Sequence, residues 1–140
     1  MTKQSFFVLA FCALFTFAGC TDPKGPQPIS GSVMFKNQPL DQGVISFFQD
    51  SAGPPTATAL IADGTYDLPA AQGLTPGKYT VRLTSTEEFK ITPEEYAAGK
   101  TAPPAKERLP AKYNVDSQEQ VEVKPGRNRF DYRLEESPRS

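Results

Sequence analysis

The sequence predicts an all-β domain of about seven strands, arranged as an antiparallel Greek-key sandwich, behind an N-terminal secretory segment. Three observations lead to this prediction. From residue 29 onward apolar residues alternate with polar ones, turn signals rich in Gly and Pro separate the alternating stretches, and one short stretch has helical character. We expect the β-sandwich domain to span residues 29–134 and a polar tail to follow at residues 135–140.

The chain starts with a short apolar run, FFVLAFCALFTF, at residues 6–17. Its twelve residues are too few for a helix that crosses a bilayer, which needs about 20. The run follows a short start that contains one cation, Lys3, and it ends in small residues, which is the layout of a secretory signal. We therefore expect residues 1–19 to be a lipoprotein-type signal peptide that is removed.

The next residues, FAGC, resemble the bacterial lipobox, in which small residues precede a cysteine that is acylated and becomes the mature N-terminus. Ala18 and Gly19 fit this pattern, whereas Phe17 stands where Leu is usual. The resemblance implies that Cys20 is lipidated and anchors the protein to a membrane. The alternative is an ordinary signal peptide in which Cys20 is incidental.

Residues 20–28 are expected to form a lipidated N-terminus and a short extended tether, because TDPKGPQP contains three prolines and a glycine. Thr21 follows the cysteine directly and resembles an outer-membrane sorting signal. We therefore expect the protein on the non-cytoplasmic side of the bacterial cell envelope, at the outer membrane in preference to the inner one.

Alternation places the strands in order along the domain. Asp63-Gly64 supplies the turn of a tight hairpin between two of them, and Pro125-Gly126 supplies another turn near the end. The expected inward-facing residues are Ile29, Gly31, Val33, Phe35, Ile45, Phe47, Tyr66, Leu68, Tyr79, Val81, Leu83, Val121, Val123, Phe130, Tyr132 and Leu134. The stretches that carry them are ISGSVMF, GVISFFQ, TATALIADGTYDL, KYTVRLTS and QVEVKPGRNRFDYRL.

The long connection at residues 86–120 lacks this alternation of apolar and polar residues, and connections of this length tend to be functional or disordered. Thr92 has the features of a helix N-cap, since a proline and two acids follow it. The pattern predicts a short helix through about Ala98 that ends at Gly99. Three prolines are expected to keep the rest of the connection extended.

Composition excludes several classes of function. Lys plus Arg total 15 and Asp plus Glu total 16, which argues against nucleic acid as a partner. The chain has no histidine, so a Ser-His-Asp device and a histidine-based zinc site are ruled out. The acids show no spacing that brings two together for general acid–base work. We expect no enzyme activity, no cofactor and no metal.

With the strands placed, the chain resembles the small carboxypeptidase-regulatory-like, transthyretin-like lipoproteins of planctomycete bacteria. The resemblance rests on the order of five stretches across residues 29–134, and the chain departs from the usual pattern at Leu60-Ile61. It implies a prealbumin-like fold and a non-catalytic module. Related transthyretin-like hydrolases rely on histidines and a Tyr-Arg-Gly-Ser ending, whereas this chain reads EESPRS at its end. The five stretches are SGSVMFKNQPLDQGVISFF, ADGTYDL, TPGKYTVRLT, LPAKYN and VEVKPGRNRFDYRL.

Lys112 and Tyr113, in the LPAKYN stretch, are a candidate binding pair. The structural interpretation of the same stretch is that Leu109 and Tyr113 close one end of the domain while Pro110 fixes the bend.

Two functions from different classes remain open. One is a lipid-anchored structural or binding module that engages an envelope protein or glycan through its loops and an exposed strand edge. The other is a carboxylate-based hydrolase or small-molecule carrier that uses the 86–120 loop as a lid.

The lipobox interpretation makes a direct prediction. Because Cys20 carries the acyl chains, Cys20→Ser should move the protein from the membrane fraction to the soluble fraction, and mass spectrometry should show that the acyl mass is gone. Membrane retention of the serine variant would contradict lipidation at this residue.

Overall fold

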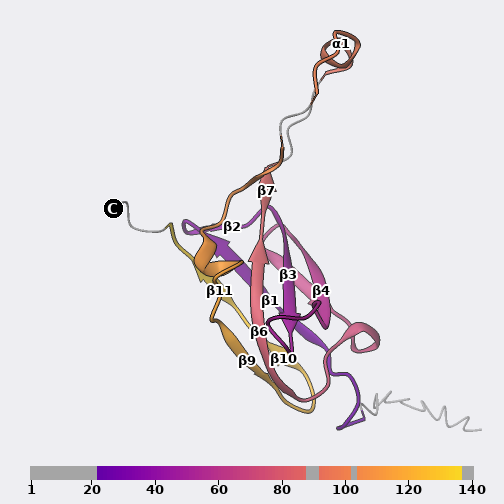
Figure 1. Ribbon diagram of the computed structural model, residues 1–140. Helices are drawn as coiled ribbons and strands as arrows, with labels where there is room; N and C mark the ends of the chain where they lie inside the picture. Colours follow the sequence, from indigo (N-terminus) through magenta and orange to yellow (C-terminus); the bar gives the residue numbers. More distant parts are fainter. Residues whose placement is uncertain (1–21, 88–91, 102–103, 137–140) are drawn as a thin grey trace, which may run out of the picture.

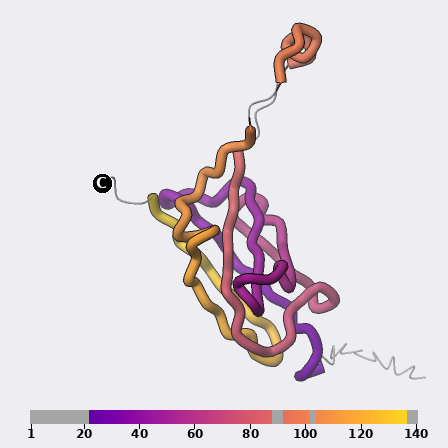
Figure 2. The backbone as a smooth tube through the Cα atoms, viewed as in Figure 1, coloured from indigo at the N-terminus to yellow at the C-terminus, as the bar shows by residue number. Residues whose placement is uncertain are grey.

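The protein is all-β, as predicted: a mostly antiparallel sheet curls into a half-barrel (Figure 1). The computed structural model describes residues 22–87, 92–101 and 104–136. The predicted signal peptide and Cys20 lie outside these residues. Figure 2 shows how the backbone runs from the N-terminal segment at one end of the sheet to the β1–β2 turn at the other.

The described chain contains more and shorter strands than the alternation predicts, because brief ribbons form at the turns and the last expected strand is divided. The strands are β1 (Ile29–Phe35), β2 (Gln38–Pro39), β3 (Gln42–Phe48), β4 (Ala57–Ala62), β5 (Thr65–Leu68), β6 (Gly77–Thr84), β7 (Thr86–Glu87), β8 (Lys106–Glu107), β9 (Gln120–Val123), β10 (Asn128–Arg129) and β11 (Tyr132–Leu134). The helical elements are η1 (Ala70–Gln72), α1 (Pro93–Ala97) and η2 (Ala111–Tyr113).

The main sheet has the order β10-β1-β5-β4-β3-β6-β9, and β11 and β2 also pair with β1. β4 and β5 are paired at a single position, Ala62 with Thr65, beside the turn that joins them. Against the expectation of an antiparallel arrangement throughout, β1 pairs in parallel with β10 and β11. The sandwich arrangement and the Greek-key connection stay predictions.

Two tight turns depend on left-handed backbone. Asp63 (φ 49°) and Gly64 (φ 74°) join β4 to β5, and they confirm the predicted hairpin. Lys36 (φ 53°) and Asn37 (φ 61°) join β1 to β2 in the same region of φ. Gly64 also donates its N–H to Leu40 O at 2.7 Å, so the β4–β5 turn is bonded to the residue that follows β2.

The core lies on the concave side of the curled sheet and confirms most of the predicted inward-facing residues. Phe47 and Val81 are fully buried at its centre. Phe35, Val121 and Phe130, also predicted to face inward, are only partly buried and pack against the margin. The cluster consists of Ile29, Val33, Leu40, Ile45, Phe47, Ala59, Ile61, Tyr66, Leu68, Leu74, Tyr79, Val81, Leu83, Leu109, Val123, Tyr132 and Leu134.

A close backbone approach explains why the last predicted strand is divided into β10 and β11. A Cβ atom on Gly31 would lie 1.8 Å from Phe130 O, so only glycine lets β1 come this near. Tyr66 donates its hydroxyl to the same carbonyl at 2.8 Å. Asp131 then replaces a main-chain partner, because its Oδ1 accepts from Ser32 N and Ser32 Oγ, both at 2.8 Å.

The predicted helix is present as α1. Thr92 is its N-cap, the Thr92 hydroxyl accepts from Glu95 N, and the Glu95 carboxylate accepts from Thr92 N, which completes a capping box. Ala98 is the C-cap, and Gly99 follows with φ 74°. The sequence therefore located both ends of this helix.

The approach at Gly31 predicts a stability effect. Gly31→Ala should lower the free energy of unfolding by about 3 kcal/mol, because the new methyl group forces β1 away from Phe130. Gly53→Ala is the matched control, since its Cβ would find its nearest neighbour, Asp50 O, at an ordinary 3.6 Å. Urea denaturation of both variants checks this, and equal effects would contradict the packing argument.

Candidate functional site

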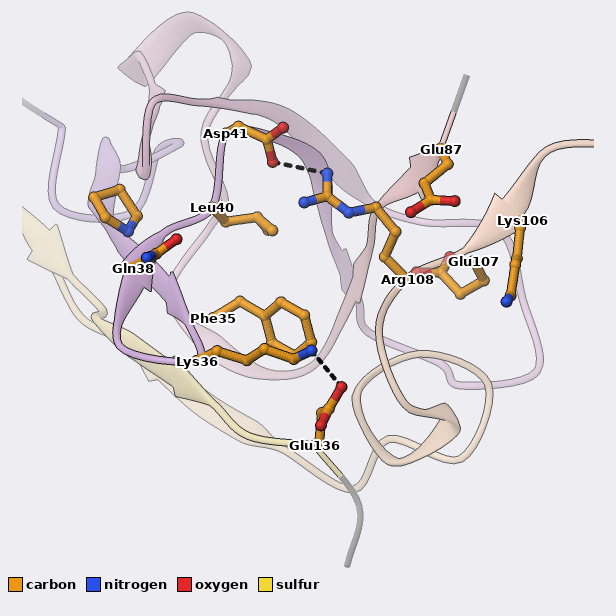
Figure 3. Close-up of a pocket in the computed structure, with 11 residues that line it drawn as sticks. Phe35, Lys36, Gln38, Leu40, Asp41, Glu87, Lys106, Glu107, Arg108 and Glu136 are labelled. Atoms are coloured by element: carbon orange, nitrogen blue, oxygen red, sulfur yellow. Dashed lines mark hydrogen bonds and ion pairs between the residues drawn. The ribbon is translucent and has the colours of Figure 1, made fainter. Parts of the chain in front are cut away.

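A charged hollow lies at the end of the sheet where β1 turns into β2 and the β7–β8 ribbon begins (Figure 3). Its volume is about 590 Å³. Four separate stretches of the chain line it, and most of its side chains are charged. The lining residues are Phe35, Lys36, Gln38, Pro39, Leu40, Asp41, Glu87, Lys106, Glu107, Arg108 and Glu136.

One wall of the hollow is fixed by an ion pair between Asp41 and Arg108. Arg108 Nη1 lies 2.7 Å from Asp41 Oδ1, and Arg108 N donates to Ser85 O at 2.7 Å. The bond from the guanidinium holds the pKa of Asp41 below its ordinary value of 3.8. Leu40, next to Asp41, is buried in the core, so this wall has a rigid base.

Glu107, next to Arg108, supports the side of the hollow that the β7–β8 ribbon forms (Figure 3). Its Oε1 accepts from Ser85 N at 2.8 Å and from Leu109 N at 3.0 Å, so this carboxylate satisfies main-chain donors at the base of the β7–β8 ribbon. Ser85 is buried and donates its hydroxyl to Gln42 O at 2.7 Å. Glu107 therefore positions the ribbon beside the hollow.

The remaining charged side chains of the hollow differ in whether they have an ion-pair partner. Lys36 and Glu136 form an ion pair across the hollow. Glu87 and Lys106 occupy paired positions on β7 and β8 but make no ion pair with any described residue. The hollow thus presents cations and anions side by side, which suits a partner rich in hydroxyl, amide or charged groups.

The carboxylates of the described chain whose pKa values shift clearly all shift downward. They are Asp41 beside Arg108, Glu95, which accepts a hydrogen bond from the backbone of Thr92, and Asp131, which accepts hydrogen bonds from Arg129 and Ser32. A general acid at neutral pH would need a raised carboxyl pKa. In residues 22–87, 92–101 and 104–136, no group of three or more acidic side chains is placed to hold a metal ion.

The structure places the predicted binding pair, Lys112 and Tyr113, in η2, outside the lining of the hollow. Tyr113 packs against the core, and its hydroxyl oxygen accepts from Glu135 N at 2.9 Å. Lys112 Nζ lies 4.8 Å from the centre of the Tyr113 ring. With Leu109 buried below, this geometry fits the structural interpretation, and a binding role for the pair stays a prediction.

A second surface lies on the convex side of the sheet, around Leu60-Ile61, where the sequence departs from the usual pattern of the family that it resembles. Ile61 is buried in the core, whereas Leu60 is 77% exposed and sits opposite Val44 of β3. Val44, Leu60 and Ile61 all line a shallow hollow of about 340 Å³. β4 carries no charged side chain, and it meets β5 only at Ala62, so most of its outer edge has no strand partner in the described chain.

Sequence reasoning missed the charged hollow. Asp41 and Arg108 are 67 residues apart, and each lies in a stretch that reads as an ordinary polar turn. The signal that could have found them is the unusual length of the 86–120 connection, whose Lys106 and Glu107 return to pair with β7.

Comparison with known proteins adds no identification: no protein-family model, curated protein or solved structure matches the chain. Among the described residues, no helix has both the length and the apolar character that a membrane span needs.

The Asp41–Arg108 pair makes stability depend on pH. Because the folded-state pKa of Asp41 is lowered, the pair stabilises the fold above about pH 4, and this contribution is lost as pH falls through the lowered value. Asp41→Asn should therefore reduce the loss of stability on acidification. The Asp41 side chain is 63% exposed, so screening by water keeps the effect at or below about 1 kcal/mol.

Urea denaturation at a series of pH values measures this effect. Glu87→Gln is the control, since it removes a carboxylate of the same hollow that has no ion-pair partner in the described chain. An acid profile that Asp41→Asn leaves unchanged would contradict the role of the pair.

Proposed function

We propose that the protein is a lipid-anchored, non-catalytic module of the bacterial cell envelope, acylated at Cys20 and placed at the outer membrane. In this proposal the charged hollow binds an envelope protein or glycan. The lipobox-like FAGC stretch supports the anchor, and the all-β fold is compatible with the proposed membership of the transthyretin-like lipoproteins. The Greek-key sandwich of seven principal strands is part of the same proposal.

The observation that carries this proposal is the placement of the two ends of the sheet. The N-terminal segment enters at the start of β1 (Figure 1). Phe35 and Lys36, at the other end of β1, line the hollow. Seven strand residues separate these ends by about 20 Å. A chain anchored through Cys20 therefore holds the hollow on the side of the domain away from the anchor.

The chemistry of the hollow favours binding over catalysis. Asp41, Glu107 and Glu136 each already have a positive or N–H partner, and the hollow borders few apolar side chains. Glu87 and Lys106 have no ion-pair partner in the described chain and are the side chains most available to a ligand. Charged and polar groups of this kind give specificity for a polar surface.

A second candidate function, a small-molecule carrier or carboxylate-based hydrolase, is favoured by one observation. Four lining residues, Glu87, Lys106, Glu107 and Arg108, come from the 86–120 segment that was considered as a lid. This alternative needs a small ligand inside the hollow and, for catalysis, a carboxyl group with a raised pKa.

In-cell crosslinking of tagged, full-length protein in its native host tests the proposal. We expect a discrete protein or glycan partner, and Lys106→Gln should lower its recovery about tenfold or more, because a hydrogen bond from a charged group is lost. Lys78→Gln on β6 is the matched control, an exposed lysine outside the hollow. Its recovery should equal that of the wild type.

Two outcomes count against the proposal. Recovery of the protein alone, at native abundance and with efficient crosslinking, would favour the small-molecule alternative. Equal loss of partner in the Lys106→Gln and Lys78→Gln variants would show that the hollow is not the contact surface.

A further inference from the structure

The segment that follows Cys20 is fastened to the domain by one buried side chain, Gln27. This residue is fully buried although it lies in a stretch that composition assigns to a tether. Gln27 Nε2 donates to Asp22 O and to Gly25 O, both at 2.7 Å, and Gln27 Oε1 accepts from Gly126 N at 2.7 Å. Three of the four hydrogen-bonding positions of the amide are therefore used.

Main-chain bonds extend this attachment. Gln27 N donates to Leu74 O at 2.8 Å, and Leu74 N donates to Gln27 O at 3.2 Å. Residues 22–25 form a turn, in which Gly25 N donates to Asp22 O at 3.1 Å and Lys24 N to Asp22 Oδ1 at 3.0 Å. The segment from Asp22 onward is thus part of the fold.

This attachment limits the distance between the domain and the anchor. Asp22 is two residues after Cys20, and two fully extended residues span at most about 7 Å. A domain anchored at Cys20 must therefore lie against the membrane surface with this end first.

Basic side chains surround the same end. Lys24 lies in the turn, and Lys124 and Arg127 flank Gly126, the residue that donates to Gln27. Asn128 braces this second turn: its Nδ2 donates to Lys124 O at 2.8 Å, and its backbone N donates to Pro28 O at 3.1 Å. All three cations are exposed.

Three acidic residues lie at this end as well. Asp22 already accepts from Lys24 N, Asp67 lines a hollow of about 310 Å³ together with Arg127 and Asn128, and Glu122 stands opposite Lys78 where β9 pairs with β6. With the exposed Lys78 included, the four cations still outnumber these three carboxylates. Cations within a Debye length of an anionic lipid surface are attracted to it.

We propose that this end of the domain, with Lys24, Lys124 and Arg127, docks directly on an anionic phospholipid surface and that Gln27 holds it in that orientation. The inference rests on the proposed lipid anchor at Cys20. It adds a second contact with the membrane, made by the folded domain, and it fixes which way the charged hollow faces.

Trypsin release from vesicles tests the docking. Acylated protein is reconstituted in vesicles of phosphatidylcholine alone or phosphatidylcholine with phosphatidylglycerol. Cleavage after Lys24 frees a fragment that starts at Gly25, which mass spectrometry identifies. We expect release about tenfold slower from the vesicles that contain phosphatidylglycerol, because docking shields the turn.

Three variants separate the contributions. The double variant Lys124→Gln/Arg127→Gln should abolish the difference between the two vesicle types. The control Lys100→Gln/Arg133→Gln, which removes two exposed charges that line neither the charged hollow nor this end, should preserve it. Gln27→Ala should speed release at least tenfold on both vesicles, because three hydrogen bonds that hold residues 22–25 and the 124–127 turn are lost.

The outcomes distinguish this inference from the anchor on which it rests. Equal release rates from both vesicle types, or an unchanged difference in Lys124→Gln/Arg127→Gln, would overturn the docking while the anchor stands. A protein that carries no acyl group and does not associate with vesicles would overturn the anchor. Because Lys124 and Arg127 are exposed, their variant stays informative even if Gln27→Ala fails to fold.

Discussion

The arrangement of this molecule depends on a buried amide, that of Gln27. Its side chain joins the N-terminal turn to the turn between β9 and β10, and its main chain pairs with Leu74 ahead of β6. A buried amide without partners would be costly, whereas this one is satisfied on both its nitrogen and its oxygen. The same few bonds therefore close the core at one end and decide where the chain leaves the domain.

Strand β1 of the curled sheet connects the end held by Gln27 to the opposite end, where the charged hollow lies. The close approach of Gly31 to Phe130 sets the position of β1 against β10 and β11. Beyond β1, the Asp41–Arg108 pair and the bonds of Glu107 hold the hollow's walls. The two ends thus have different chemistry: basic side chains gather where the chain enters, and interleaved charges of both signs gather at the opposite end. In our proposal the first end meets lipid and the second meets a polar partner.

Local patterns predicted the local structure. Alternation located β1, β3, β6 and β9, Asp63-Gly64 located a hairpin, and the Thr92 capping signal located α1 with both its ends. Each of these features is determined by residues close in sequence. The division of the last strand was not predictable, because it results from contacts of Phe130 and Asp131 with β1, about a hundred residues earlier.

The candidate sites show the same limit. The sequence drew attention to Lys112 and Tyr113 because they stand in a conspicuous stretch, yet Tyr113 packs on the core. From their composition, residues 20–28 are expected to form a tether, and no neighbouring residue in the sequence indicates that Gln27 is buried. The hollow brings together the stretches around Asp41 and Arg108, and neither stretch has a sequence feature that indicates a site. Long-range pairing created each of these features, and a single sequence does not display it.

The most direct test of the central claim is the depth of the two ends relative to the bilayer. In the acylated protein, a fluorophore on the cysteine of Pro125→Cys and another on the cysteine of Gln38→Cys report the Gln27 end and the hollow end separately. A lipid-attached quencher should strongly quench the label at position 125 and barely affect the one at position 38, because β1 holds these ends about 20 Å apart. Equal quenching at both positions would show that the domain has no fixed orientation and would contradict the account.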